Sequence, residues 1–103
     1  MNLLNPILVC TIAALAAILS GSRSAHAEPP PRSLAMSCFT CHGPAGKSPD
    51  AIPSINGKNA SFIEANMKAF RSGKRQSTVM QRIAKGYTDR EIKALAGYIA
   101  NLK

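Results

Sequence analysis

The clearest pattern in the chain lies near its carboxyl end, where apolar residues recur every three or four positions. The residues with this spacing are Ile92, Leu95, Ala96 and Ile99. Such spacing places them on one face of a helix. Thr88 and Glu91 precede the run with the spacing of a capping box, which satisfies free N–H groups at a helix start. The pattern predicts a helix from Asp89 to about Leu102, packed across the first helix of the domain.

A second helix is predicted from Ser61 to about Arg71. Ser61 and Glu64 have the spacing of another capping box, and Gly73 follows the expected end. The residues spaced for its buried face are Phe62, Ala65, Ala69 and Phe70.

A first helix is expected from Ser33, as N-cap, to Gly43. Six glycines and prolines then punctuate residues 43–60, which predicts an irregular loop. Residues 76–86 carry Met80, with Ile83 expected in the core and Gly86 as a helix stop. Because no stretch has a strand pattern, the predicted fold class is all-α.

The first 27 residues are typical of a secretory signal peptide. Residues 7–19 form a run of 13 mostly apolar residues, which is short for a membrane span, and Ala25-His26-Ala27 matches an A-x-A cleavage site. We therefore predict three segments: a cleaved signal at 1–27, an extended proline-rich lead-in at 28–32 and one domain at 33–103. An uncleaved anchor is the alternative, whereas cleavage predicts no stable membrane insertion and a periplasmic protein.

Charge and length narrow the function classes. Removing the signal leaves 76 of the 103 residues, with 12 basic and 5 acidic side chains, a net charge of +7. Such a short chain buries only a small core. Its positive charge favours encounter with acidic protein surfaces. Nucleic acid is not expected as a partner, because the chain has no basic helix and no basic and aromatic interleaving.

The chemistry is concentrated in Cys38-Phe39-Thr40-Cys41-His42. C-x-x-C-H is the spacing of covalent c-type haem attachment. Residues three and four apart share a helix face, so Cys38, Cys41 and His42 can meet one planar ligand. The two thiols would form thioethers with haem vinyl groups, and His42 would bind the iron.

Three other interpretations of the cysteine pair leave His42 unexplained. A thioredoxin-like pair needs a βαβ scaffold, for which the chain is too short and too helical. Half a zinc site would lack a second pair of ligands in the cleaved chain. A structural disulfide suits an exported protein but gives the adjacent histidine no role.

A histidine that binds a metal usually donates its second ring N–H to an oxygen acceptor. Pro53 lies 11 residues after His42, and its carbonyl is the candidate acceptor. An ordinary loop proline is the alternative.

The second axial position of the iron needs another donor, and cleavage leaves three methionines as candidates. Met36 is too close to the cysteines to reach the opposite haem face, and Met67 has core spacing. Met80, between two predicted helices and 38 residues after His42, is far enough along the chain. Met/His ligation is the electron-transfer pattern. An open iron position is the alternative.

Four stretches of the chain resemble class I c-type cytochromes, and within them the single-haem cytochrome subunit of flavocytochrome c sulfide dehydrogenase. They are CFTCHGPAGKSPDAIPSING, MKAFRSGKR, STVMQRIAKGYTDREI and KALAGYIANL. The segment with Met80 favours the sulfide dehydrogenase group. Cytochromes of the c4 and c5 type share the CHG start and the opening of the last helix.

The resemblance implies a small cytochrome c fold of about three to five helices around one covalent haem. Cys38 and Cys41 match the thioether positions, His42 the proximal ligand, Met80 the distal ligand and Pro53 the carbonyl acceptor. It also implies a FAD-containing sulfide-oxidising partner subunit and a downstream soluble cytochrome c. Because this chain has no G-x-G-x-x-G, sulfide chemistry would belong to the partner, and the chain is not an enzyme on its own.

Three functions follow from these observations. The first is the haem subunit of a sulfide-oxidising complex, which the Met80 segment favours. The second is a freely diffusing c4/c5-like carrier between respiratory complexes, which the net charge favours. The third is a haem enzyme or sensor with an open iron position, which an absence of Met80 ligation would indicate.

Overall fold

The computed structural model describes residues 26–103, and this part of the chain is all-α, as predicted. Its elements in order are helix α2 (Pro31–His42), the short 3-10 helix η1 (Pro44–Gly46), α3 (Ala60–Ser72), α4 (Met80–Ala84) and α5 (Asp89–Ala100). No strand occurs within residues 26–103. The predicted signal segment lies outside the described residues apart from its last two, so the division into domains stays a prediction.

The carboxyl-terminal helix begins as the sequence predicts. The Thr88 hydroxyl accepts a hydrogen bond from Glu91 N at 3.2 Å, and the Glu91 carboxylate accepts one from Thr88 N at 2.8 Å. This reciprocal pair is the predicted capping box. The helix ends at Ala100, two residues earlier than expected, where Asn101 N bonds to the Tyr98 carbonyl at 3.2 Å.

The other two predicted helix starts are wrong. Helix α2 begins at Pro31, because a proline in the first helical position already has the required φ and has no N–H to satisfy. Helix α3 begins at Ala60 with Asn59 as N-cap and without a side-chain cap. Glu64 does not complete a capping box with Ser61 and instead pairs with Lys68 at 2.7 Å.

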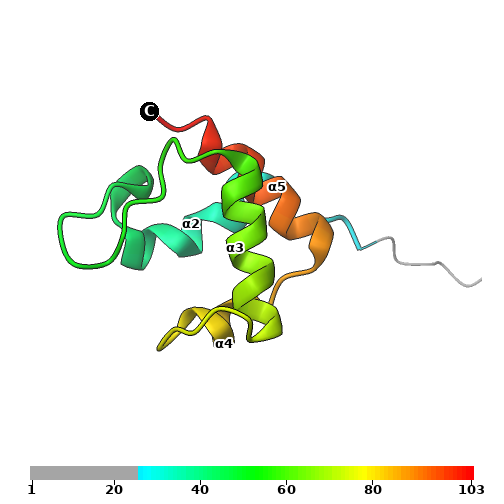
Figure 1. Ribbon diagram of the computed structural model, residues 1–103. Helices are drawn as coiled ribbons and strands as arrows, with labels where there is room; N and C mark the ends of the chain where they lie inside the picture. The colour runs from blue at the N-terminus through cyan, green and yellow to red at the C-terminus, as the bar shows by residue number, and fades with distance from the viewer. Residues whose placement is uncertain (1–25) are drawn as a thin grey trace, which may run out of the picture.

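The helices pack around one small core. Helix α3 packs on α5 and α4, and α2 packs on α5 as expected from the apolar stripe (Figure 1). Nine apolar side chains are buried: Leu34, Ala35, Ile63, Met67, Ala84, Ile92, Leu95, Ala96 and Ile99. Three of them are alanines, so the core has little apolar volume for a domain of this length.

Two predicted core positions are exposed. Phe62 is 54% exposed, because the buried side of α3 is formed by Ile63 and Met67, one residue further along the helix. Ile83 is 39% exposed and lies one turn after Met80 in α4. Met67 fills the core as predicted.

A long loop connects α2 to α3 and runs beside the end of α2 (Figure 1). Gly43 ends α2 with φ of 84°, and a Cβ there would lie 1.9 Å from the Lys47 carbonyl oxygen. Only glycine fits such a position. The loop is tied back through Ile55 N, which bonds to the Gly46 carbonyl at 2.9 Å. None of the helices in the described range is long and apolar enough to cross a membrane.

The two capping predictions can be compared directly by mutation. Thr88→Ala is expected to lower the free energy of unfolding by about 1 kcal/mol, because it removes a side-chain cap. Ser61→Ala is the matched control and is expected to cost less, since α3 has no side-chain cap. Urea unfolding of the purified variants measures both. Equal losses would contradict the assignment of the caps.

Candidate functional site

The last turn and a half of α2 presents the C-x-x-C-H side chains together. Cys38 is half-buried, Cys41 is exposed, and both thiols are free. His42 is the last residue of the helix and is half-buried. The helical spacing therefore gives all three side chains the common side that the sequence predicts.

Burial controls the protonation of the first cysteine. Burial raises the pKa of the Cys38 thiol, and hydrogen bonds from Ser37 and from its own backbone only partly oppose this effect. Cys38 therefore stays a neutral thiol at neutral pH. A thiol that adds across a vinyl group delivers both its sulfur and its hydrogen, so the neutral form suits thioether formation.

The loop after α2 fixes the histidine ring. His42 Nδ1 lies 2.6 Å from the Pro53 carbonyl oxygen. Because a carbonyl only accepts hydrogen bonds, Nδ1 donates and Nε2 carries the free lone pair. The imidazole is thus held in the tautomer that can bind a metal through Nε2. This is the contact proposed for Pro53, although its role beside bound iron stays a prediction.

The remaining predicted ligand lies on a different helix. Met80 is the first residue of α4, whereas the sequence placed it in a segment between helices. Its side chain is half-buried and packs against the edge of the core. Ser77 holds the start of α4 by accepting a hydrogen bond from Gln81 N at 3.0 Å. Because α4 packs on α3, the structure does not bring Met80 into direct contact with α2.

The donor set fits a c-type haem. Two thiols, one neutral imidazole nitrogen and one thioether are the groups that such a haem uses. Exposed apolar side chains adjoin these donors in the sequence: Ile52 precedes Pro53, Val79 precedes Met80, and Ile83 follows Met80 by one turn. They supply the apolar contacts that a flat porphyrin ring needs. The assignment of individual ligands stays a prediction.

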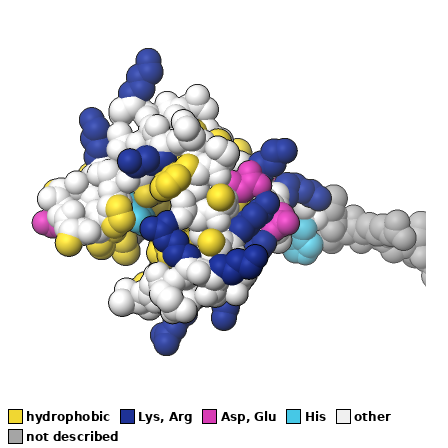
Figure 2. Space-filling view, viewed as in Figure 1, with side chains coloured by type: hydrophobic (Ala, Val, Ile, Leu, Met, Phe, Trp, Pro, Cys, Tyr) yellow, Lys and Arg dark blue, Asp and Glu magenta, His cyan; other side chains and the backbone are white. Residues whose placement is uncertain are grey.

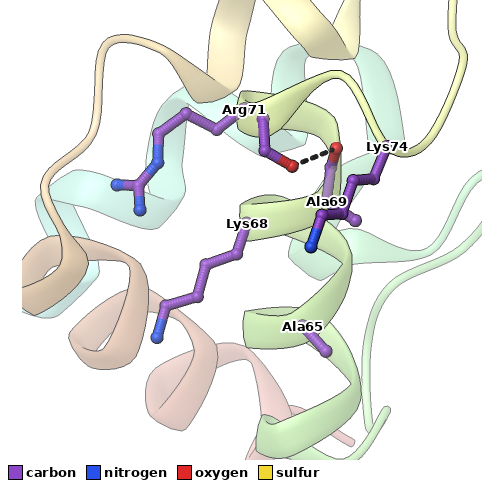
Figure 3. A pocket seen from close by; sticks show the side chains of 6 residues that line it. Ala65, Lys68, Ala69, Arg71 and Lys74 are labelled. Atoms are coloured by element: carbon purple, nitrogen blue, oxygen red, sulfur yellow. Dashed lines mark hydrogen bonds between the residues drawn. The ribbon is translucent and has the colours of Figure 1, made fainter.

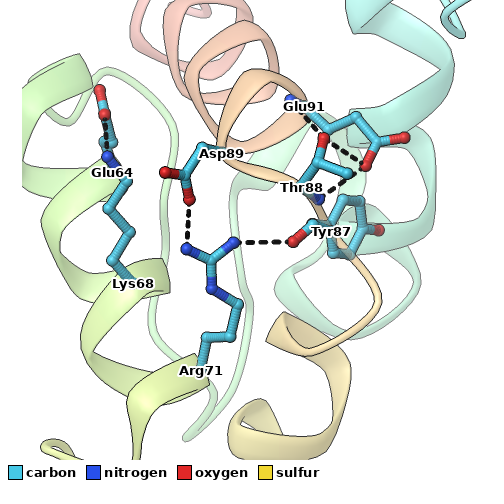
Figure 4. A network of polar contacts seen from close by, with 7 residues as sticks. All are labelled: Glu64, Lys68, Arg71, Tyr87, Thr88, Asp89 and Glu91. Atoms are coloured by element: carbon cyan, nitrogen blue, oxygen red, sulfur yellow. Dashed lines mark hydrogen bonds and ion pairs between the residues drawn. The ribbon is translucent and has the colours of Figure 1, made fainter.

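The basic cluster noted near the end of α3 is largely paired within the chain. Lys68 binds Glu64 at 2.7 Å, and Arg71 forms an ion pair with Asp89 (Figure 4). Arg75 bonds to Asn66 and lies over the Phe70 ring, 5.0 Å from its centroid. A surface hollow along α3 lies among Ala65, Lys68, Ala69, Arg71, Ser72 and Lys74 (Figure 3). No predicted haem-binding residue borders this hollow.

One contact of the site was missed from the sequence. The Tyr87 hydroxyl lies 2.8 Å from Ser37 Oγ, next to Cys38. The Tyr87 carbonyl accepts a hydrogen bond from Arg71 at 2.9 Å (Figure 4). The position of Tyr87 just before a capping box marks it as a linker residue, but no spacing rule relates it to a partner 50 residues earlier.

The pairing of Arg71 with Asp89 predicts a pH dependence. The Arg71 guanidinium lowers the pKa of Asp89 below its ordinary value of 3.8. Because the folded state favours the carboxylate, the stabilisation is complete above that value and is lost as the pH falls through the lowered pKa. Thermal unfolding between about pH 5 and about pH 2 is expected to depend less on pH in Asp89→Asn than in the unmodified chain.

Arg71→Gln provides the reciprocal test of the same pair. It is expected to show the same weakened pH dependence, since either substitution removes the ion pair. Curves that run parallel to that of the unmodified chain over this pH range would contradict the assignment.

Comparison with known proteins gives a consistent result. A family profile described as cytochrome C oxidase, cbb3-type, subunit III matches residues 25–99. The cytochrome subunit of sulfide dehydrogenase from Chlorobaculum tepidum is 51% identical over 69 residues, which are 67% of this chain and 63% of that protein. The thiosulfate dehydrogenase electron acceptor of Stutzerimonas stutzeri is 38% identical over 63% of this chain and 32% of that protein.

A third relative is matched over more of its length. Cytochrome c-553 of Helicobacter pylori is 37% identical over 78 residues, which are 70% of this chain and 77% of that protein. The chain therefore spans less than two thirds of the first two relatives and about three quarters of the third.

Proposed function

Because this chain belongs to the class I c-type cytochromes, we propose that it is a single-haem electron carrier with Cys38 and Cys41 as attachment residues and His42 and Met80 as axial ligands. The observation that carries this proposal is the single C-x-x-C-H turn, whose histidine is already oriented by the Pro53 carbonyl. When bound, the haem supplies a one-electron couple between ferric and ferrous iron.

The residues around this couple have separate roles. The two cysteines keep the haem on the protein, and Pro53 fixes the His42 ring and makes its Nε2 a stronger donor. The Met80 thioether is a soft neutral donor that favours ferrous iron and raises the potential. None of these side chains is asked to transform a substrate, so the chain transfers electrons without catalysis of its own.

For the finer function, we propose the haem subunit of a sulfide-oxidising complex in the periplasm. The support is the 51% identity to the sulfide dehydrogenase cytochrome subunit, together with the predicted signal segment at 1–27. A flavoprotein partner with FAD would oxidise sulfide and pass electrons singly to the haem. This chain would then reduce a soluble cytochrome c.

The charge distribution supports docking to acidic protein surfaces. Residues 73–86, which include Met80, carry Lys74, Arg75, Arg82 and Lys85 and no acidic side chain. All four are exposed. Figure 2 shows basic side chains spread over one face of the molecule, with hydrophobic side chains between them and few acidic ones. Such a surface favours rapid encounter with an acidic redox protein.

The function is tested on protein purified gently from its native host. A flavoprotein is expected to copurify, and added sulfide is expected to reduce the haem. Dithionite, which reduces the haem without a partner, is the control for haem integrity. A haem protein that dithionite reduces but sulfide does not, and that carries no flavin, would refute the dehydrogenase function.

A freely diffusing carrier is the second candidate. The similarity to Helicobacter pylori cytochrome c-553 over 77% of that protein favours it, as does the net positive charge. In this case the purified protein would be free of flavin. Its electron exchange with an acidic redox partner would slow steeply as salt increases.

A further inference from the structure

Tyr87 connects three helices through two different groups. It lies in the linker between α4 and α5, and its hydroxyl reaches Ser37 on α2 at 2.8 Å. Its backbone carbonyl accepts a hydrogen bond from Arg71 on α3 at 2.9 Å (Figure 4). A single residue of the linker is therefore fastened to two helices that are far apart in the sequence.

The direction of the hydroxyl bond follows from its neighbours. Ser37 Oγ also lies 3.1 Å from the Leu34 carbonyl, to which it donates its hydrogen. A serine hydroxyl has one hydrogen, so Ser37 can only accept from Tyr87. Tyr87 is therefore the donor, and its replacement by phenylalanine removes the bond without leaving Ser37 in need of a new acceptor.

The same linker is fastened to the helix that carries Met80. Gly86 N bonds to the Ile83 carbonyl at 3.0 Å, and Tyr87 N bonds to the Ala84 carbonyl at 3.3 Å. Helix α4 has five residues, so its position depends on tertiary contacts rather than on its own stability. On the other side, Ser37 directly precedes Cys38.

We propose that Tyr87 is a positioning residue that holds Met80 at the iron by tying the end of α4 to α2 and α3. The inference rests on the proposed ligand role of Met80. Helix α4 packs mainly on α3, and the attachment residues are on α2, so the spacing of the two axial ligands needs a link between these helices. The Ser37–Tyr87–Arg71 contacts are a polar link that meets this need.

The test measures how readily Met80 leaves the iron. Imidazole binds ferric haem only when the methionine is displaced, so its affinity reports the opening of that bond. Tyr87→Phe is expected to raise imidazole affinity about two- to tenfold, the effect of losing one hydrogen bond. Tyr98→Phe is the matched control and is expected to bind imidazole like the unmodified protein.

Two further variants separate positioning from general stability. Thr88→Ala destabilises α5 without removing a Tyr87 contact, and its imidazole affinity is expected to be unchanged. Ser37→Ala is expected to raise the affinity, and Ser37→Ala with Tyr87→Phe is expected to raise it no further than Tyr87→Phe alone. Equal increases in Thr88→Ala and Tyr87→Phe would refute a specific positioning role.

Met80→Ala distinguishes a failed inference from a failed ligand assignment. If Met80→Ala binds imidazole much more tightly and Tyr87→Phe does not, Met80 is the ligand and the positioning role is wrong. If Met80→Ala binds imidazole no more tightly than the unmodified protein, the ligand assignment is wrong and the positioning role falls with it. Neither result depends on the identity of the electron donor.

Discussion

Replacement of both Cys38 and Cys41 by alanine is expected to give a chain that holds no covalent haem and does not fold stably. The thioethers are the only covalent links proposed between protein and haem, and without them His42 and Met80 alone must retain the group. The expected loss of stability is large, because the haem is proposed to supply much of the apolar core.

The small core explains this dependence. Of its nine buried side chains three are alanines, and the largest fully buried ones are Ile92, Leu95 and Ile99. They lie where α5 meets α2 and α3, leaving the side chains around Met80 and Pro53 without a buried centre. A domain of fewer than 80 residues rarely gains enough stability from such a core alone.

Acid extraction of haem measures the attachment directly, and circular dichroism at increasing temperature measures the fold. Cys38→Ala or Cys41→Ala alone is expected to retain one thioether or no haem, with reduced stability in either case. Thr40→Ala is the matched control, because Thr40 is exposed between the two cysteines. Haem that resists extraction from the double variant, as it does from Thr40→Ala, would overturn the attachment assignment.

Local sequence signals predicted the elements that local interactions build. The Thr88 and Glu91 capping box was predicted because both partners lie within four residues. Gly43 was predicted to end α2 because few other residues tolerate its backbone conformation. The attachment motif could likewise be read directly, since its spacing is set by the pitch of one helix.

Predictions failed where two local signals competed or where the partner was distant. In α3, two adjacent apolar stripes were possible, and packing against α5 chose Ile63 and Met67 over Phe62. The Ser61 signal lost to a helix start one residue earlier. The contact between Ser37 and Tyr87 crosses 50 residues, so it needs the tertiary structure to be seen.

Met80→Ala is expected to lower the midpoint potential strongly while leaving the haem attached. Axial ligands set haem potentials across a range of about 0.8 V, so loss of a thioether that favours ferrous iron is expected to lower this potential by on the order of 0.1 V or more. The iron would then have an open position that carbon monoxide fills in the ferrous state without displacing a protein ligand. Redox titration and carbon monoxide binding measure the two effects.

The other methionines are internal controls for this assignment. Met36 is 53% exposed on α2, and Met36→Leu is expected to keep the potential and the stability of the unmodified protein. Met67 is buried in the core, so Met67→Ala is expected to cost about 2–5 kcal/mol of stability while the ligand set is retained. If Met80→Ala keeps both its spectrum and its potential, Met80 is not the ligand. Carbon monoxide binding to the unmodified protein without displacement of a ligand would then favour an open iron, and with it an enzyme or sensor over an electron carrier.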